Sequence, residues 1–142
     1  MEEGVKGRHA VEAVVVSCMD FRLYSGDLSA NLFRAIRETF AIGDFDILTT
    51  AGGAKNTAAL LEDIGLALEK HHAKKVILLN HENCGKYASE GIVFSVEEKE
   101  KEKEFHAKEL ANAAKIVKER FPGADVITGY AVFKNDNSIS IT

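Results

Sequence analysis

The chain has 142 residues, of which 46% are hydrophobic and 28% charged, the proportions of one ordinary globular domain rather than a disordered chain. Its 22 acidic against 18 basic side chains give a net charge of -4, which argues against nucleic acid or an anionic membrane surface as a partner. No apolar run approaches the roughly 20 residues of a membrane-spanning helix, and residues 1–10 lack the apolar segment of a secretory signal, so we expect a cytoplasmic protein.

The first half of the chain is predicted to contain two strands, each followed by a helix. Residues 14–16 form a β-branched run that stops at Cys18, which is typical of a strand buried on both faces. A second short strand is expected at 47–50, before the turn Ala51-Gly52-Gly53. Apolar residues at helical spacing predict both helices, namely Leu28, Leu32, Ile36 and Phe40 in the first and Leu60, Leu61, Ile64, Ala67 and Leu68 in the second.

The second half predicts a strand at 76–79, a long helix and a closing hairpin. Ser95 and Glu98 form a capping box for the long helix, just as Asn56 or Thr57 is expected to cap the helix before it. The apolar seam of the long helix consists of Leu110, Ala113, Val117 and Phe121. A fourth strand over 126–133 and a turn at 135–137 lead to a final edge strand at 138–141.

Strands that alternate with helices predict an α/β fold in a single domain, 1–142. We expect a mostly parallel sheet with right-handed crossovers, helices on both faces and an antiparallel C-terminal edge strand. In such open sheets ligands bind beyond the carboxyl ends of the strands. The residues placed at those ends are therefore the candidates for chemistry.

Cysteine and histidine follow two of the predicted strands. The chain has only two cysteines, Cys18 and Cys84, too few for a disulfide framework. If the first and third strands are neighbours, both thiolates meet the imidazole of His81, a ligand set that zinc prefers. Three protein ligands leave one tetrahedral position open, as in catalytic rather than structural zinc sites. His-x-x-Cys alone is a weak signal, and the strand-end Cys18 strengthens it.

The motifs taken together resemble the β-class carbonic anhydrases. That family has Cys-x-Asp-x-Arg after the first strand, an Ala-Gly-Gly-type turn, and then His-x-x-Cys-Gly. The matching residues, in a resemblance that extends over about 11–141, are Cys18, Asp20, Arg22, Ala51-Gly52-Gly53, His81, Cys84 and Gly85. The resemblance implies a homodimeric zinc enzyme that reversibly hydrates CO2 to bicarbonate, with Zn2+ held by Cys18, His81 and Cys84.

The resemblance also implies roles for Asp20 and Arg22 as the catalytic pair beside the metal. Zinc lowers the pKa of bound water to roughly 7, which makes hydroxide available to attack CO2. Asp20 would orient that hydroxide by accepting its hydrogen bond, while Arg22 would hold Asp20 away from the metal. If Arg22 released it, Asp20 could become the fourth ligand.

The chain departs from the family in the predicted substrate pocket. Phe21 stands where a small residue is usual, and Thr49-Thr50 replaces Arg-Asn. We also expect the family's N-terminal helical arm to be absent. We expect Phe21, Gly52 and Gly53 to shape this pocket.

Three other functions stay open. The zinc site could act on another small electrophile, such as carbonyl sulfide or carbon disulfide. It could instead be a non-catalytic zinc or small-anion module with Asp20 as fourth ligand. Thiol redox chemistry ranks last, because Cys-x-x-Cys is missing. The histidines left out of the site are His9, His71, His72 and His106.

Overall fold

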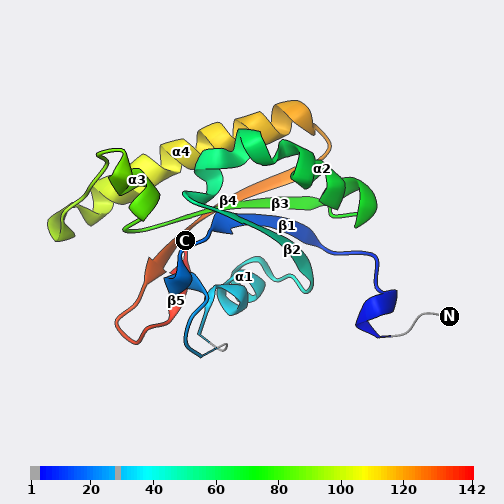
Figure 1. Cartoon of the computed structure of the whole chain (residues 1–142), viewed down its shortest axis with the longest axis horizontal. Helices are drawn as coiled ribbons and strands as arrows, with labels where there is room; N and C mark the ends of the chain where they lie inside the picture. Colours follow the sequence, from blue (N-terminus) through cyan, green and yellow to red (C-terminus); the bar gives the residue numbers. More distant parts are fainter. Residues whose placement is uncertain (1–3, 28–29) are drawn as a thin grey trace.

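The computed structural model describes residues 4–27 and 30–142. Within these ranges the strands form one five-stranded sheet in the order β2-β1-β3-β4-β5, parallel except for β5 (Figure 1). The strands are β1 (Ala13–Cys18), β2 (Phe45–Thr50), β3 (Lys75–His81), β4 (Asp125–Phe133) and β5 (Ile139–Ile141). The sheet confirms the predicted α/β fold, including its antiparallel C-terminal edge strand.

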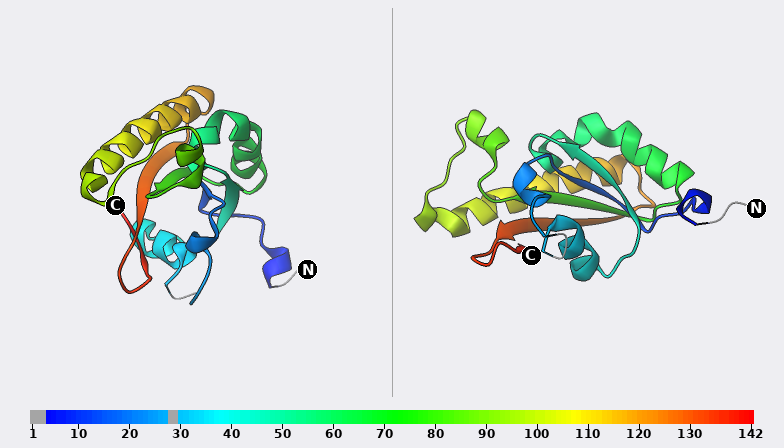
Figure 2. Two further views of the ribbon diagram at one scale, coloured as in Figure 1. Left: turned by 60° about the vertical axis from the view of Figure 1, so that its left-hand side comes forward. Right: turned by 60° about the horizontal axis from the view of Figure 1, so that its bottom comes forward.

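Helices cover both faces of this sheet. Helices α2 and α4 lie side by side over one face, and α1 lies against the other (Figure 1, Figure 2). The helices are α1 (Leu32–Phe40), α2 (Leu61–Lys70), α3 (Gly85–Ser89) and α4 (Lys99–Arg120). In the described part of the chain, none of them has both the length and the apolar character needed to cross a membrane.

The central strands are buried on both sides. Successive side chains of a strand point to opposite faces, so Val16 packs with Ile64 of α2 and Val117 of α4, whereas Val15 packs with Ile36 of α1. All five of these side chains are fully buried. Two separate apolar layers explain why β1 and β3 are continuous apolar runs rather than alternating ones.

The start of α2 differs from the sequence prediction. The helix begins at Leu61, after the 3-10 segment Gly53–Leu60, so the prediction that Asn56 or Thr57 caps it is wrong. Asn56 Nδ2 instead donates a hydrogen bond of 2.5 Å to the carbonyl of Ala51. An asparagine amide can satisfy turn backbone as well as a helix end, and here it stabilises the glycine turn.

Two other helix starts have side-chain caps. Asn31 Oδ1 accepts hydrogen bonds from the first backbone amides of α1, a cap that sequence reasoning missed. The apolar residue Leu28, predicted to belong to the same helix, lies outside the described residues. The capping box of Ser95 and Glu98 is confirmed, ahead of α4.

A buried polar cluster joins the carboxyl end of β3 to α4. Asn80 Oδ1 accepts from the Ala54 amide at 3.1 Å, and its Nδ2 donates to the Tyr87 hydroxyl at 3.1 Å. The same Nδ2 lies 3.0 Å from Nδ1 of His106, which is 1% exposed and stacks on Tyr130. Burial lowers the pKa of His106 to about 4, so this imidazole is neutral and accepts from the amide.

Protonation of His106 should make the fold sensitive to acid. Because its pKa falls from 6.5 to about 4 on folding, the unfolded chain binds the proton more readily, and stability decreases as the pH drops through this window. We expect the wild type to lose on the order of 1.4 kcal/mol more than His106→Gln for each pH unit. Urea unfolding of both proteins at several pH values measures this difference. Identical pH dependence would contradict a buried, neutral His106.

Candidate metal centre

The predicted metal ligands come from the carboxyl ends of two paired strands. Strands β1 and β3 are parallel neighbours, which confirms the arrangement on which the sequence prediction depended. Cys18 is the last residue of β1 and His81 the last of β3. Cys84 follows in the next loop, as the residue that precedes α3. Three side chains distant in sequence therefore reach the same edge of the sheet.

The ligand atoms of Cys18, His81 and Cys84 lie within 4.8 Å of one another, and all three residues are buried. Zinc bonds of about 2.0–2.3 Å place ligand atoms roughly 3.3–3.8 Å apart. The three atoms are thus gathered on the scale that one ion requires. Asp20 is not part of this group, although its Oδ2 is 3.8 Å from His81 Nε2.

The hydrogen bonds of His81 leave one ring nitrogen without a partner. Nδ1 lies 2.6 Å from the carbonyl oxygen of Glu82, so Nδ1 carries the proton and donates it. Nε2 is buried and has no hydrogen-bond partner among the described residues. A buried polar atom left unpaired costs about 1–3 kcal/mol, and a metal ion would remove that cost. The tautomer and the carbonyl partner are those of a typical metal-ligating histidine.

The pKa values of the two thiols are shifted in opposite directions. A hydrogen bond from Cys84 is the main cause that lowers the pKa of Cys18, and the nearby His81 side chain and the Gly52 and Asp20 backbone act in the same direction. The pKa of Cys84 is raised, chiefly because it holds the shared proton beside Cys18 and because it is buried. The first proton leaves readily and the second does not. A divalent cation among these atoms would favour loss of both.

Asp20 and Arg22 form a close ion pair beside the ligand group. Arg22 Nη2 donates to Asp20 Oδ2 at 2.7 Å, and Nε lies 3.1 and 3.2 Å from the two carboxylate oxygens. The Arg22 backbone amide adds a bond of 2.9 Å to Oδ1. Side-chain hydrogen bonding from Arg22 is the main cause that lowers the pKa of Asp20. The carboxylate is therefore ionised at neutral pH.

Asn83 and Phe133 complete the surroundings of Arg22, and sequence reasoning missed both. The side-chain oxygen of Asn83 accepts from Arg22 Nη1 at 3.0 Å, and its backbone carbonyl accepts from Nη2 at 2.9 Å. The guanidinium carbon lies 5.0 Å from the centre of the Phe133 ring. The only signal available in the sequence was an asparagine inside His81-Glu82-Asn83-Cys84, a residue type that tolerates left-handed backbone.

The glycine turn supports Cys18 from the neighbouring strand. A Cβ on Gly53 would lie 2.6 Å from the Leu79 carbonyl oxygen and 3.1 Å from the Cys18 amide, at a φ of +56°. Gly52 also has positive φ, and its backbone hydrogen-bonds to Cys18. Phe21, by contrast, is 75% exposed. Of the three residues predicted to shape a substrate pocket, the two glycines thus contact the site backbone and Phe21 faces solvent.

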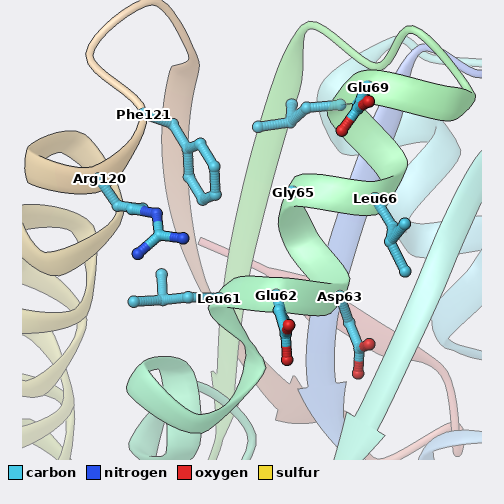
Figure 3. Close-up of a pocket in the computed structure, with 9 residues that line it drawn as sticks. Leu61, Glu62, Asp63, Gly65, Leu66, Glu69, Arg120 and Phe121 are labelled. Carbon is cyan, nitrogen blue, oxygen red and sulfur yellow. The ribbon is translucent and has the colours of Figure 1, made fainter.

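Cavities lie both near the ligand group and far from it. A small one of about 120 Å3 borders Cys84 and is lined in part by Asn83, Glu102 and His106. A larger groove has a volume of about 740 Å3. Figure 3 shows that it lies between α2 and the end of α4, with Arg120 and Phe121 along one side. None of the predicted site residues lines the larger groove. The donor atoms of the predicted site therefore lie apart from this groove.

Two proteins of similar sequence are uncharacterised, and solved structures that resemble this chain share its fold. No family model matches the chain. An uncharacterised protein of Rickettsia bellii is 29% identical over 136 residues, which cover 89% of this chain and 80% of that protein. An uncharacterised protein of Rickettsia conorii is 28% identical over 141 residues, covering 89% and 70%.

Solved structures that resemble this chain include carbonic anhydrases and a carbon disulfide hydrolase. The carbonic anhydrase of Glaciozyma antarctica has a TM-score of 0.54 at 15% identity and covers 97% of this chain and 88% of its own. A β-carbonic anhydrase of Trichomonas vaginalis gives 0.55 at 14%, covering 99% and 87%. Carbon disulfide hydrolase gives 0.52 at 20%, covering 97% and 81%. The chain therefore has the β-carbonic anhydrase fold, which confirms the resemblance at the level of the fold.

Gly53 should be intolerant of any side chain. We expect Gly53→Ala to lower the free energy of unfolding by more than about 1 kcal/mol, because alanine is strained at positive φ and its Cβ meets backbone atoms. Gly26→Ala is a matched control, since Gly26 also has positive φ but, among the described residues, has nothing within 4 Å of the added atom. Thermal denaturation compares the two. Equal losses would show that the close contacts at Gly53 are unimportant.

Proposed function

We propose that this chain is a zinc enzyme that reversibly hydrates CO2 to bicarbonate, with Zn2+ held by Cys18, His81 and Cys84. The observation that carries the proposal is the buried, unpartnered Nε2 of His81 beside two cysteine sulfurs, all within 4.8 Å. Zinc in such a site lowers the pKa of coordinated water to about 7 and so supplies a nucleophile near neutral pH. The neighbouring pair Asp20 and Arg22 is suited to orient the reacting groups.

Asp20 is suited to accept a hydrogen bond and to orient a reacting group. Its side chain is only 14% exposed, so water competes weakly for its oxygens. The lowered pKa keeps it an acceptor at neutral pH. Arg22 holds both carboxylate oxygens at 2.7–3.2 Å, and this pair directs the carboxylate without placing it among the metal ligands.

The fold similarity supports a second candidate, hydrolysis of carbon disulfide or carbonyl sulfide. Carbonic anhydrases and a carbon disulfide hydrolase resemble this chain to nearly the same extent. Both named reactions begin with addition of a water oxygen to a small carbon electrophile. The fold and ligand set suit either, so the walls of the pocket decide between them.

A homodimer is also part of the proposal. Met19 and Phe21 flank Asp20 and are 64% and 75% exposed, and a second copy would remove these apolar side chains from water. Carbonic anhydrases of Sordaria macrospora with the same fold are described as tetrameric, at a TM-score of 0.50 and 14% identity. The reduced thiols that zinc requires agree with the cytoplasmic location expected from the sequence.

The purified, reduced protein should contain one zinc ion per chain. Cys18→Ser and Cys84→Ser should each lose most of it, because removing a ligand from a three-residue site sharply lowers affinity. His106→Gln is the matched control: His106 is also a buried histidine, but it lies outside the donor group, and its variant should keep the metal. Mass spectrometry of bound metals measures the ratio. A metal-free wild type that takes up no added zinc would refute the site.

Stopped-flow CO2 hydration tests the reaction itself. The zinc-loaded wild type should accelerate hydration, and Asp20→Asn should be about 10- to 100-fold slower at unchanged zinc content, because the amide is a poorer acceptor and weakens the pair with Arg22. Sulfide release from carbon disulfide tests the second candidate in parallel. Full zinc occupancy without either activity would instead favour a non-catalytic zinc module.

A further inference from the structure

The ion pair beside the ligand group is held on its far side by a residue that the proposed chemistry does not use. Arg22 directs Nε and Nη2 to Asp20, and directs Nη1 and Nη2 to the two oxygens of Asn83 at 3.0 and 2.9 Å. One guanidinium thus bridges the loop after β1 and the loop after β3. Its planar fork suits such simultaneous contacts.

The conformation of Asn83 is itself supported by α4. Its φ is +55°, in the left-handed region, and its backbone amide donates a hydrogen bond of 2.8 Å to Glu102 Oε2. With the amide bound to α4, both the side-chain oxygen and the carbonyl oxygen of Asn83 contact the same guanidinium. Asparagine is among the few residues that adopt this backbone region readily.

Phe133 provides the third contact of Arg22. Its ring lies 5.0 Å from the guanidinium carbon and meets the His81 ring edge-on at 5.9 Å between centroids. The Phe133 amide donates to Glu82 Oε2 at 2.6 Å, which ties the end of β4 to the residue after His81. The guanidinium therefore contacts groups from three different segments.

This support matters because Asp20 lies within reach of the metal ligands. Its Oδ2 is 3.8 Å from His81 Nε2, and a carboxylate oxygen is itself a zinc ligand. The Arg22 side chain is 37% exposed, and an exposed ion pair by itself is a weak restraint. Further contacts are needed to keep the pair in one arrangement.

We propose that Asn83 is a positioning residue that anchors Arg22 and, through it, keeps the Asp20 carboxylate away from the coordination position left open by Cys18, His81 and Cys84. The inference rests on the proposed metal site and not on the identity of the substrate. It predicts that loss of the Asn83 side chain closes that position to added ligands, and that Asp20 is required for the closure.

The test is azide binding to the full chain loaded with Co2+, followed by the visible absorption of the metal. Asn83→Gly keeps the left-handed backbone and removes the side-chain oxygen. We expect it to bind azide at least about tenfold more weakly than wild type, the scale of one hydrogen bond to a charged group. Asn137→Gly is the matched control, because Asn137 is another left-handed asparagine, with φ of +68°, in the turn before β5. It should bind azide as wild type does.

The Asp20→Ala background separates positioning from a general structural role. If Asn83 acts through Asp20, then Asn83→Gly changes azide affinity in the wild type but not in Asp20→Ala. Equal weakening in both backgrounds, or no weakening in either, overturns the proposal. A chain that takes up no Co2+ or Zn2+ refutes both the metal site and this inference. A chain that shows the azide pattern without hydrating CO2 refutes only the proposed reaction.

Discussion

Because β1 and β3 run parallel and pair side by side, the chain leaves both strands at one edge of the sheet, and every group of the site depends on that pairing. Cys18 ends β1 and His81 ends β3, so the first sulfur and the imidazole are brought together by backbone hydrogen bonds rather than by their own interactions. Cys84 follows after one short loop. The buried apolar layers on the two faces hold the strands rigidly, which is what a metal site needs from its scaffold.

The charges of the site balance in a way that makes its burial physically reasonable. Two thiolates would neutralise a divalent ion, and Asp20 neutralises Arg22 at 2.7 Å. The two sulfurs share a proton, and His81 Nε2 has no hydrogen-bond partner among the described residues. Buried charges and polar atoms are tolerated when they are paired and hydrogen-bonded, and a cation among these three donor atoms would supply the missing partner.

Much of the fold and part of the site could be predicted from local patterns. The apolar runs at 14–16 and 76–79 indicated strands covered on both faces, and Ser95 with Glu98 indicated a helix start, because these signals depend only on neighbouring residues. The start of α2 could not be predicted in this way. Asn56 resembles a helix cap in sequence, but its side-chain amide donates a hydrogen bond to the Ala51 carbonyl in the folded turn. Only the folded chain shows that Asn56 stabilises this turn and not the start of the helix.

The sequence by itself determined which segments are strands, the spacing of Cys18, Asp20 and Arg22, and the His-x-x-Cys motif, since these are properties of short segments. Only the tertiary structure decided that β1 lies beside β3, that His81 Nε2 has no partner among the described residues, and that Asn83 and Phe133 contact Arg22. Those contacts join residues separated by up to 111 positions in the chain (22 to 133). No local periodicity encodes such contacts, because they arise from the order in which the strands pair.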